Sequence, residues 1–237
     1  MSNLAVITAR GGSKRIPRKN IRDFCGKPII AYSIEAAITS GLFDEVMVST
    51  DDQEIAEVAK KYGANVPFFR SSDTSDDYAT TRDVLIEVLS MYKKTGSTFE
   101  YICCIYPTAP FVTQEKLRNG LDILKESGAD RLEPVVKFEC PPQWGLTINE
   151  KGYLQYIYPE YARMRSQDLE PLFHDAGQFY WYDVDSCFFS SKDKLSVSTI
   201  ILPEGEVQDI DNESDWLIAE MKYKLWRRKD GKGAETV

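Results

Sequence analysis

The sequence predicts an α/β fold with a mainly parallel central sheet, and two observations carry this prediction. Short apolar runs alternate through the first half of the chain with longer segments whose apolar residues recur every three or four positions. Polar turns that contain glycine or proline separate the two kinds of segment. Strands and helices in alternation form βαβ units, whose right-handed crossovers place the turns after successive strands at one edge of the sheet. We therefore expect ligands to bind at that edge.

The helices of the first half carry recognisable start and stop signals. Pro28 begins a helix that ends at Gly41. Asp51 or Asp52 caps a second helix, which ends at Gly63. The remaining predicted helices lie at 84–92 and from 117 to 128. The predicted strands of this half lie at 4–7, 45–50, 66–69 and 101–106.

The regular pattern breaks at about 138–172, where prolines and tyrosines gather. Alternation at 153–158 predicts a hairpin or an extended arm inserted into a single domain that spans 1–237. Two interpretations stay open, because an aromatic insertion can make subunit contacts or can fold as a flap on its own core. The pattern resumes with predicted strands at 178–182 and 197–202 and with a last helix that carries residues 216–225.

The charge and the composition exclude several classes of function. The net charge of −8 argues against a general affinity for nucleic acid or for an anionic membrane. The sequence contains no apolar run near the roughly 20 residues that a membrane span needs, and nothing at its start resembles a signal peptide. Its five cysteines form no CxxC pair. We therefore expect reduced thiols in a cytoplasmic protein.

The most informative segment is the basic glycine loop, residues 9–20, which follows the first strand. Two glycines permit a tight turn and a close approach of the backbone to a ligand, and five basic side chains crowd the same loop. The loop matches neither a Walker A sequence nor GxGxxG. Backbone amides and cations at the end of a strand nevertheless make a phosphate-binding device. The candidate phosphate ligands are Ala9, Arg10, Gly11, Gly12, Ser13, Lys14, Lys19 and Asn20.

A second candidate is the carboxylate pair Asp209 and Asp211. In an extended segment, residues i and i+2 point to the same side, so the two carboxylates converge. A cation between them relieves their repulsion, and Mg²⁺ suits a site that has few protein oxygens and completes its shell with water and phosphate. The alternative is that Asp211 or Asn212 caps the last helix. Capping explains the later acids and leaves Asp209 unexplained.

Three further segments carry weaker signals. His174, the only histidine, precedes a late strand but has no partner signature of a catalytic group. Arg163 and Arg165 suit bidentate binding of a substrate carboxylate, or equally a surface ion pair with nearby acids. Arg70, in the polar stretch 70–81, is a candidate contact to a phosphate or a base.

Taken together, these segments resemble the acylneuraminate cytidylyltransferases. The resemblance rests on the basic glycine loop, on Val48-Ser49-Thr50-Asp51, on Arg70 and on the Asp209-Ile210-Asp211 run, in the order typical of the family. Residues 165–169, 173–177 and 206–211 are similar to the branch that activates pseudaminic acid. Tyr106 and Ala176 depart from the residues typical of the sialic acid branch, which disfavours N-acetylneuraminate as the sugar.

The resemblance implies a Rossmann-like three-layer sandwich, a homodimer whose dimerisation arm is the 138–172 insertion, and transfer of CMP from CTP to a nine-carbon acidic sugar. It implies catalytic roles for Arg10, Lys19, Asp209 and Asp211, with Mg²⁺ on the two aspartates. Pro107 and Thr108 join the nucleotide site. The implied sugar contacts are Tyr106, Arg165, His174 and Gln178. The alternatives are the same reaction on legionaminate, N-acetylneuraminate or Kdo, a metal-dependent glycosyltransferase, and a non-catalytic nucleotide-binding module.

Overall fold

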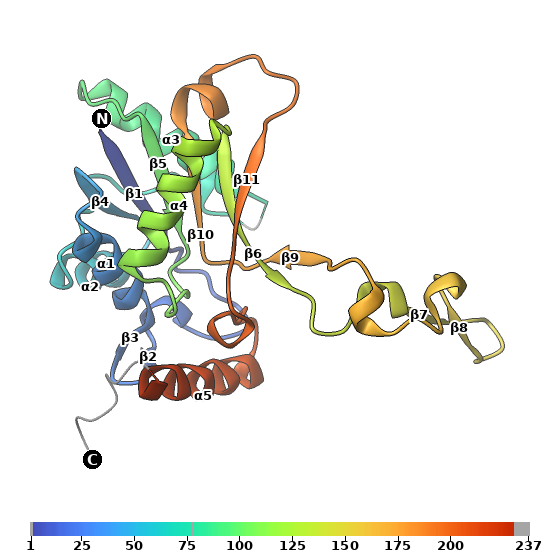
Figure 1. Ribbon diagram of the computed structural model, residues 1–237. Coiled ribbons are helices and arrows are strands. Elements are labelled where there is room, and N and C mark those ends of the chain that lie inside the picture. The colour runs from blue at the N-terminus through green and yellow to red at the C-terminus, as the bar shows by residue number, and fades with distance from the viewer. Residues whose placement is uncertain (1, 77, 230–237) are drawn as a thin grey trace.

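The computed structural model describes residues 2–76 and 78–229 and has a central seven-stranded sheet with the order β11-β6-β10-β5-β1-β4, in which β9 also pairs with β6 (Figure 1). Strands β4, β1 and β5 are parallel, and β10 is antiparallel to both β5 and β6, so β6 and its parallel neighbour β11 run in the same direction as β5. The sheet is therefore mainly parallel, as predicted. Its strands are β1 (Asn3–Thr8), β4 (Glu45–Ser49), β5 (Tyr101–Ile105), β6 (Arg131–Lys137), β9 (Phe173–Asp175), β10 (Phe179–Asp183) and β11 (Val197–Ile201).

Helices cover both faces of the sheet. Side chains of α1 (Ile29–Ser40), α2 (Gln53–Lys61) and α4 (Gln114–Ser127) pack in one buried cluster with one face of the strands. Those of α3 (Thr81–Lys94) pack against the opposite face. The last helix, α5 (Glu213–Lys229), contributes to a separate aromatic cluster around Phe24. This arrangement confirms the predicted three-layer α/β sandwich.

The helix boundaries follow the predicted caps. The side chain of Asp52 accepts a hydrogen bond from the amide of Ile55 at the start of α2. Gly41 and Gly128 follow α1 and α4 with φ of 63° each, a left-handed conformation that favours glycine. These local signals placed all four helices of the first half to within a few residues.

The prediction of a strand at 66–69 is wrong. The chain there runs beside β4 and makes only an isolated bridge between Met47 and Asn65, because Pro67 has no N–H to donate to a ladder. Two strands of the central sheet were missed, and so were the short strands β2 (Asp23–Phe24) and β3 (Lys27–Pro28), which pair with each other. In β6 a proline and charged residues interrupt the apolar pattern, although alternate side chains from Leu132 onward are buried. Strand β9 has only three residues, all exposed.

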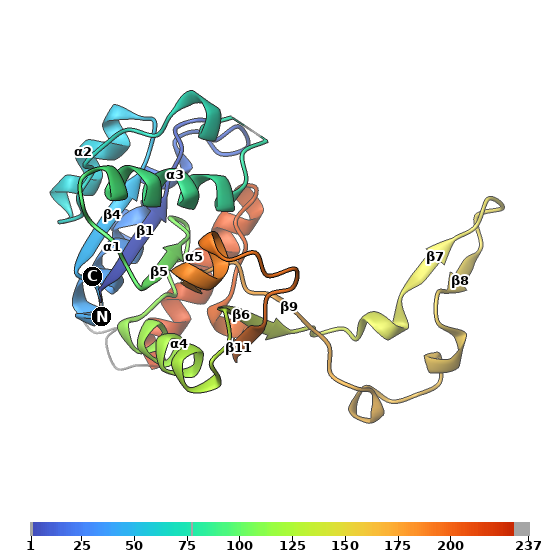
Figure 2. The ribbon, with the colours of Figure 1, turned by 90° about the horizontal axis from the view of Figure 1, so that it is seen from above.

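The segment between β6 and β9 extends away from the body of the molecule and ends in the hairpin of β7 (Leu146–Ile148) and β8 (Leu154–Tyr156) (Figures 1 and 2). The apolar side chains of the hairpin strands are exposed, with 69% of Ile148 and 67% of Leu154 accessible to solvent. A flap packed on its own core would bury these side chains, so the structure argues against that interpretation. A role of this segment in dimerisation stays a prediction.

Candidate functional site

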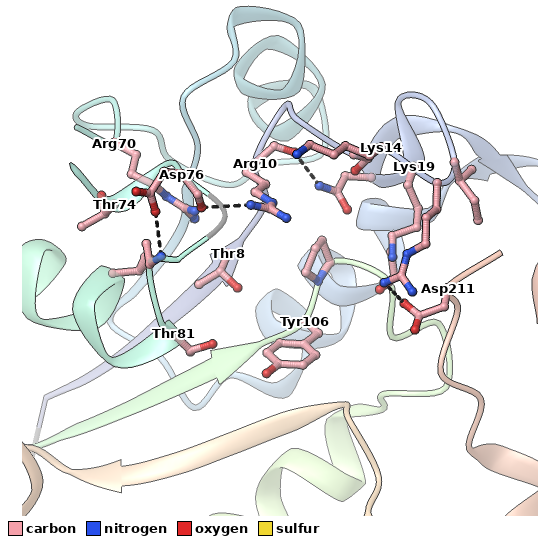
Figure 3. A pocket seen from close by; sticks show the side chains of 18 residues that line it. Thr8, Arg10, Lys14, Lys19, Arg70, Thr74, Asp76, Thr81, Tyr106 and Asp211 are labelled. Carbon is pink, nitrogen blue, oxygen red and sulfur yellow. Dashed lines mark hydrogen bonds and ion pairs between the residues drawn. The ribbon is translucent and has the colours of Figure 1, made fainter. Parts of the chain in front are cut away.

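The carboxyl ends of β1, β4 and β5 open onto a cavity of about 670 Å³ (Figure 3). In Figure 3, Arg10, Lys14 and Lys19 lie along one side of the cavity, and Tyr106 and Thr81 lie on the other. The cavity is lined by Thr8, Arg10, Ser13, Lys14, Arg15, Ile16, Lys19, Asn20, Arg70, Thr74, Asp76, Ala79, Thr81, Val84, Tyr106, Pro107, Thr108 and Asp211. The predicted sheet edge thus holds most of the predicted nucleotide ligands.

The basic glycine loop is anchored to the segment after β4. The amide of Gly11 donates to Oδ1 of Asp51 at 2.8 Å. A Cβ atom on Gly11 would lie 2.7 Å from Oδ2 of Asp52, whereas a Cβ on Gly12 would meet nothing within 4 Å. Gly11 is therefore required by packing, and Gly12 leaves its side of the loop open to a ligand.

Arg18 holds the far end of this loop in a strained conformation. Its φ of 56° is left-handed, which is uncommon for a residue with a side chain. Its guanidinium donates to both carboxylate oxygens of Asp52, at 2.5 and 2.9 Å, and also contacts Glu54. The hydrogen bond from Arg18 is the largest contribution that lowers the pKa of Asp52. This pairing, which the sequence does not reveal, fixes the loop against the start of α2.

Lys19 joins the basic glycine loop to the acidic segment near the C-terminus. Its Nζ donates to the carbonyl oxygen of Ile210 at 2.7 Å. Burial lowers the pKa of Lys19, and the nearby carboxylates of Asp211 and Asp209 oppose that shift. Arg15 pairs with Asp211 at 2.6 Å. Cations and carboxylates from opposite ends of the sequence therefore meet in the lining of one cavity.

The last helix is capped without Asp209. Oδ1 of Asn212 accepts from the amides of Ser214 and Asp215, and Oδ2 of Asp215 accepts from the amides of Asp211 and Asn212. Asn212 is therefore the N-cap of this helix, and Asp215, three positions later, completes a capping box. The Asp211 carboxylate lines the cavity instead.

The donor set of the acidic segment fits a hard cation. Asp209 and Asp211 offer only oxygen, and both act electrostatically on the ammonium of Lys19. Within residues 2–76 and 78–229, no group of three or more His, Cys, Asp or Glu side chains could hold a metal. A metal here would need phosphate and water for its remaining ligands, which is the coordination that Mg²⁺ favours.

Arg70 enters the cavity from the segment that follows residues 66–69, where a strand was wrongly predicted. It is held at the end of β4, because its Nε donates to Oγ of Ser49 at 3.1 Å and its guanidinium also donates to the Ser49 carbonyl at 2.8 Å. Burial lowers the pKa of Arg70, but an arginine stays charged at neutral pH. Arg70 therefore supplies a preoriented positive charge to the wall of the cavity.

Several predicted ligands do not line the cavity. Ala9 is buried, and its amide donates to the carbonyl of Ser49. Arg165 lies in the extended arm and forms a bidentate pair with Asp168. His174 is on β9, where its ring lies 4.7 Å from that of Phe138. Gly11 and Gly12 lie next to residues that do line the cavity, and Asp209 is two residues away from Asp211, which lines it.

Gln178, a predicted sugar contact, has a different position. Only 3% of it is exposed, and its Nε2 donates to the carbonyl oxygen of Glu206 at 2.6 Å. The backbone carbonyl oxygen of Gln178 accepts a hydrogen bond from the amide of Tyr106 at 2.8 Å. Tyr106 does line the cavity, and its ring lies 5.3 Å from that of Tyr180. In this structure Gln178 supports the wall of the cavity from behind.

Three threonines that line the cavity, Thr8, Thr74 and Thr81, were not among the predicted site residues. Thr8 ends the first strand, and the other two belong to the polar stretch 70–81. The signal that could have placed this stretch at the cavity was its position at the same sheet edge as the basic glycine loop.

The comparisons with known proteins agree with this geometry. The sequence pattern of the family described as "Cytidylyltransferase" matches residues 4–143, so the chain belongs to the cytidylyltransferases, a family of nucleotidyltransferase enzymes. Pseudaminic acid cytidylyltransferase of Campylobacter jejuni subsp. jejuni serotype O:2 is 41% identical over 231 residues, covering 95% of this chain and 97% of the relative. CMP-N,N'-diacetyllegionaminic acid synthase of Legionella pneumophila is 34% identical over 236 residues, covering 95% of this chain and 97% of the relative.

A solved structure shares the fold. CMP:2-keto-3-deoxy-manno-octonic acid synthetase, solved in complex with CTP, superposes with a TM-score of 0.68 at 16% identity, covering 96% of this chain and 100% of that one. The fold likeness agrees with the Rossmann-like sandwich, and the sequence relatives confirm the resemblance to CMP-sugar synthetases. Among the described residues, no helix is both long enough and apolar enough to cross a membrane.

Proposed function

We propose that this chain transfers CMP from CTP to the anomeric hydroxyl of a nonulosonic acid, with pseudaminic acid as the sugar, and releases pyrophosphate. One observation carries the proposal: the basic glycine loop and Asp211 line the same cavity at the carboxyl ends of the strands. A cavity with clustered cations and a facing carboxylate suits a triphosphate with its metal. The relatives at 41% identity support pseudaminic acid over other sugars.

In the proposed reaction, the sugar oxygen attacks the α-phosphorus of CTP while the bond to pyrophosphate breaks. Arg10, Lys14 and Lys19 hold the triphosphate and neutralise the charge that develops on the leaving pyrophosphate. Mg²⁺, held by Asp209 and Asp211, would polarise phosphate oxygens when bound. Arg70 and the loop at Pro107 and Thr108 bind the nucleoside end.

A pyrophosphate assay tests this reaction. Purified protein is incubated with CTP, Mg²⁺ and each of pseudaminate, legionaminate, N-acetylneuraminate and Kdo. We expect turnover to be highest with pseudaminate. Faster turnover of another acid sugar would overturn the sugar assignment and keep the reaction. CTP binding without turnover of any sugar would favour a nucleotide-binding module. Transfer of the sugar from a preformed CMP-sugar to an acceptor hydroxyl, with release of CMP, would favour a glycosyltransferase.

Two substitutions test the assignment of Lys19 and Asp211 to the catalytic site. Lys19→Ala and Asp211→Asn should each reduce turnover by roughly 10²-fold or more, as removal of a transition-state donor does elsewhere. Lys60→Ala on α2 and Asp122→Asn on α4 make the same chemical changes at exposed positions and serve as controls. Near-normal pyrophosphate release by both site variants would refute the assignment.

The same proposal includes a homodimer in the cytoplasm, formed through the extended arm. The exposed apolar side chains of the hairpin, among them Ile148 and Leu154, support this role because apolar patches of this kind mark interaction sites. The five cysteines are free thiols, in keeping with a reducing compartment. Analytical ultracentrifugation of the wild type and of an Ile148→Glu/Leu154→Glu variant tests the dimer. A monomeric wild type would contradict it.

A further inference from the structure

The acidic segment is held in place by side chains from distant elements. Residues 202–212 connect β11 to α5 and contain only a short 3₁₀ turn, Glu204–Glu206. Four of their carbonyl oxygens accept hydrogen bonds from side chains of other elements, three of them at 2.8 Å or less. These three bonds run from Lys222 to Val207 at 2.8 Å, from Gln178 to Glu206 at 2.6 Å and from Lys19 to Ile210 at 2.7 Å. The position of Asp209 and Asp211 is therefore set from outside their own segment.

Glu206 is also held by an ion pair. Its Oε2 lies 2.7 Å from Nζ of Lys116, in the first turn of α4, and only 12% of the lysine side chain and 24% of the glutamate side chain are exposed. The same Nζ donates to the carbonyl of Phe111 at 2.8 Å. A sheltered pair with this additional hydrogen bond is held in one geometry far better than a surface pair is.

The loop at 106–111, which bears the cavity residues Pro107 and Thr108, is thus tied to Glu206 at both of its ends. At its start, the amide of Tyr106 donates to the carbonyl of Gln178, whose side chain donates to Glu206. At its end, the Phe111 carbonyl accepts from Lys116, which pairs with Glu206. The two walls of the cavity, one with Thr108 and the other with Asp211, are linked through Glu206.

From this we propose that Lys116 and Glu206 are positioning residues for the metal-binding segment. The proposal rests on the proposed function, because it requires Asp209 and Asp211 to hold the cation. The Lys116–Glu206 pair holds the segment that bears these carboxylates at a fixed distance from the loop at 106–111, so that the aspartates would be in place to hold a cation beside the phosphates of the nucleotide. Outer residues that orient metal ligands affect metal affinity by about 10- to 100-fold.

The test measures binding of Mn²⁺, as a paramagnetic substitute for Mg²⁺, in the protein with CTP and no sugar, so that no turnover occurs. Free Mn²⁺ is read by electron paramagnetic resonance against a control with CTP alone. We expect Lys116→Met and Glu206→Gln each to weaken Mn²⁺ binding by about tenfold or more. Affinity for CTP without metal should stay within about twofold. The double variant should be no weaker than the worse single one, because both changes break one contact.

Two controls separate positioning from folding. Lys125→Met makes the same change near the other end of α4 and should leave Mn²⁺ binding unchanged. Lys116→Arg keeps the charge and should recover most of the affinity. If both pair variants lower the melting temperature but bind Mn²⁺ like the wild type, the pair is merely structural and the inference is wrong. If Asp211→Asn also binds Mn²⁺ normally, the metal site in the proposed function fails instead.

Discussion

Replacement of Gly11 by alanine tests how the basic glycine loop is packed. The added Cβ would lie 2.7 Å from Oδ2 and 3.0 Å from Cβ of Asp52. Carbon atoms in contact are normally about 3.5–4.0 Å apart, so either the loop or Asp52 must move by about 0.5 Å or more. Asp52 cannot turn away freely, since it accepts from the Ile55 amide and pairs with Arg18.

The cost follows from this geometry. Overpacking of a well-fitted site costs about 1–3 kcal/mol, and loss of the Asp52 cap would cost about 1 kcal/mol by the alternative route. We therefore expect Gly11→Ala to lower the free energy of unfolding by about 1–3 kcal/mol. At about 2–4 °C per kcal/mol for a chain of this size, the melting temperature should fall by about 2–12 °C.

Gly12→Ala is the matched control, because nothing lies within 4 Å of its added Cβ. Urea unfolding should place this variant within about 0.5 kcal/mol of the wild type. The affinity of this variant for CTP, measured by calorimetry, then reports the effect of the added methyl group on ligand binding, separately from any effect on stability. Equal stability of the Gly11→Ala variant and the wild type, or equal destabilisation by both alanines, would refute the packing argument.

Three further predictions concern the same region. Burial lowers the pKa of Lys19 from its ordinary 10.5, and CTP binding needs the protonated lysine. The value of kcat/KM for CTP should therefore begin to fall with rising pH below pH 10.5, and Lys19→Arg should move this decline to higher pH. The pKa of Asp52 is lower in the folded state because of Arg18. The difference in unfolding free energy between the wild type and Arg18→Met should therefore be largest at pH 7 and should shrink as the pH falls below about 4, as unfolding measured over a range of acid pH would show. Cys25 and Gly26 both have positive φ and form the two-residue turn between Asp23–Phe24 and Lys27–Pro28, so Cys25→Asn should stabilise the fold by about 1 kcal/mol and raise the melting temperature by about 2–4 °C. An unchanged or lower melting temperature would contradict the turn assignment.

Most of the fold was predictable because its signals are local. Caps, glycine stops and apolar periodicity depend on neighbours within a few residues, and these signals placed α1 to α4 and the strands β1, β4 and β5. The errors lie where a local signal was weak or was overridden. Pro67 prevents the expected strand at 66–69, and the charged alternation around Pro134 hid β6. The alternation at 153–158 predicted a hairpin or an extended arm, and the structure has the hairpin β7–β8 at the end of an extended segment, although β7 itself was not located.

By itself, the sequence determined the α/β class, the basic glycine loop, the acidic pair and the resemblance to the cytidylyltransferases, since each is written in contiguous residues. Tertiary structure alone decided which side chains meet across the chain. It brought Lys19 to Ile210, 191 positions away in the sequence, turned Gln178 inward onto Glu206, and paired Lys116 with Glu206. Such partners depend on how the sheet, α4 and the connection to α5 pack together, and residue spacing carries no record of that packing.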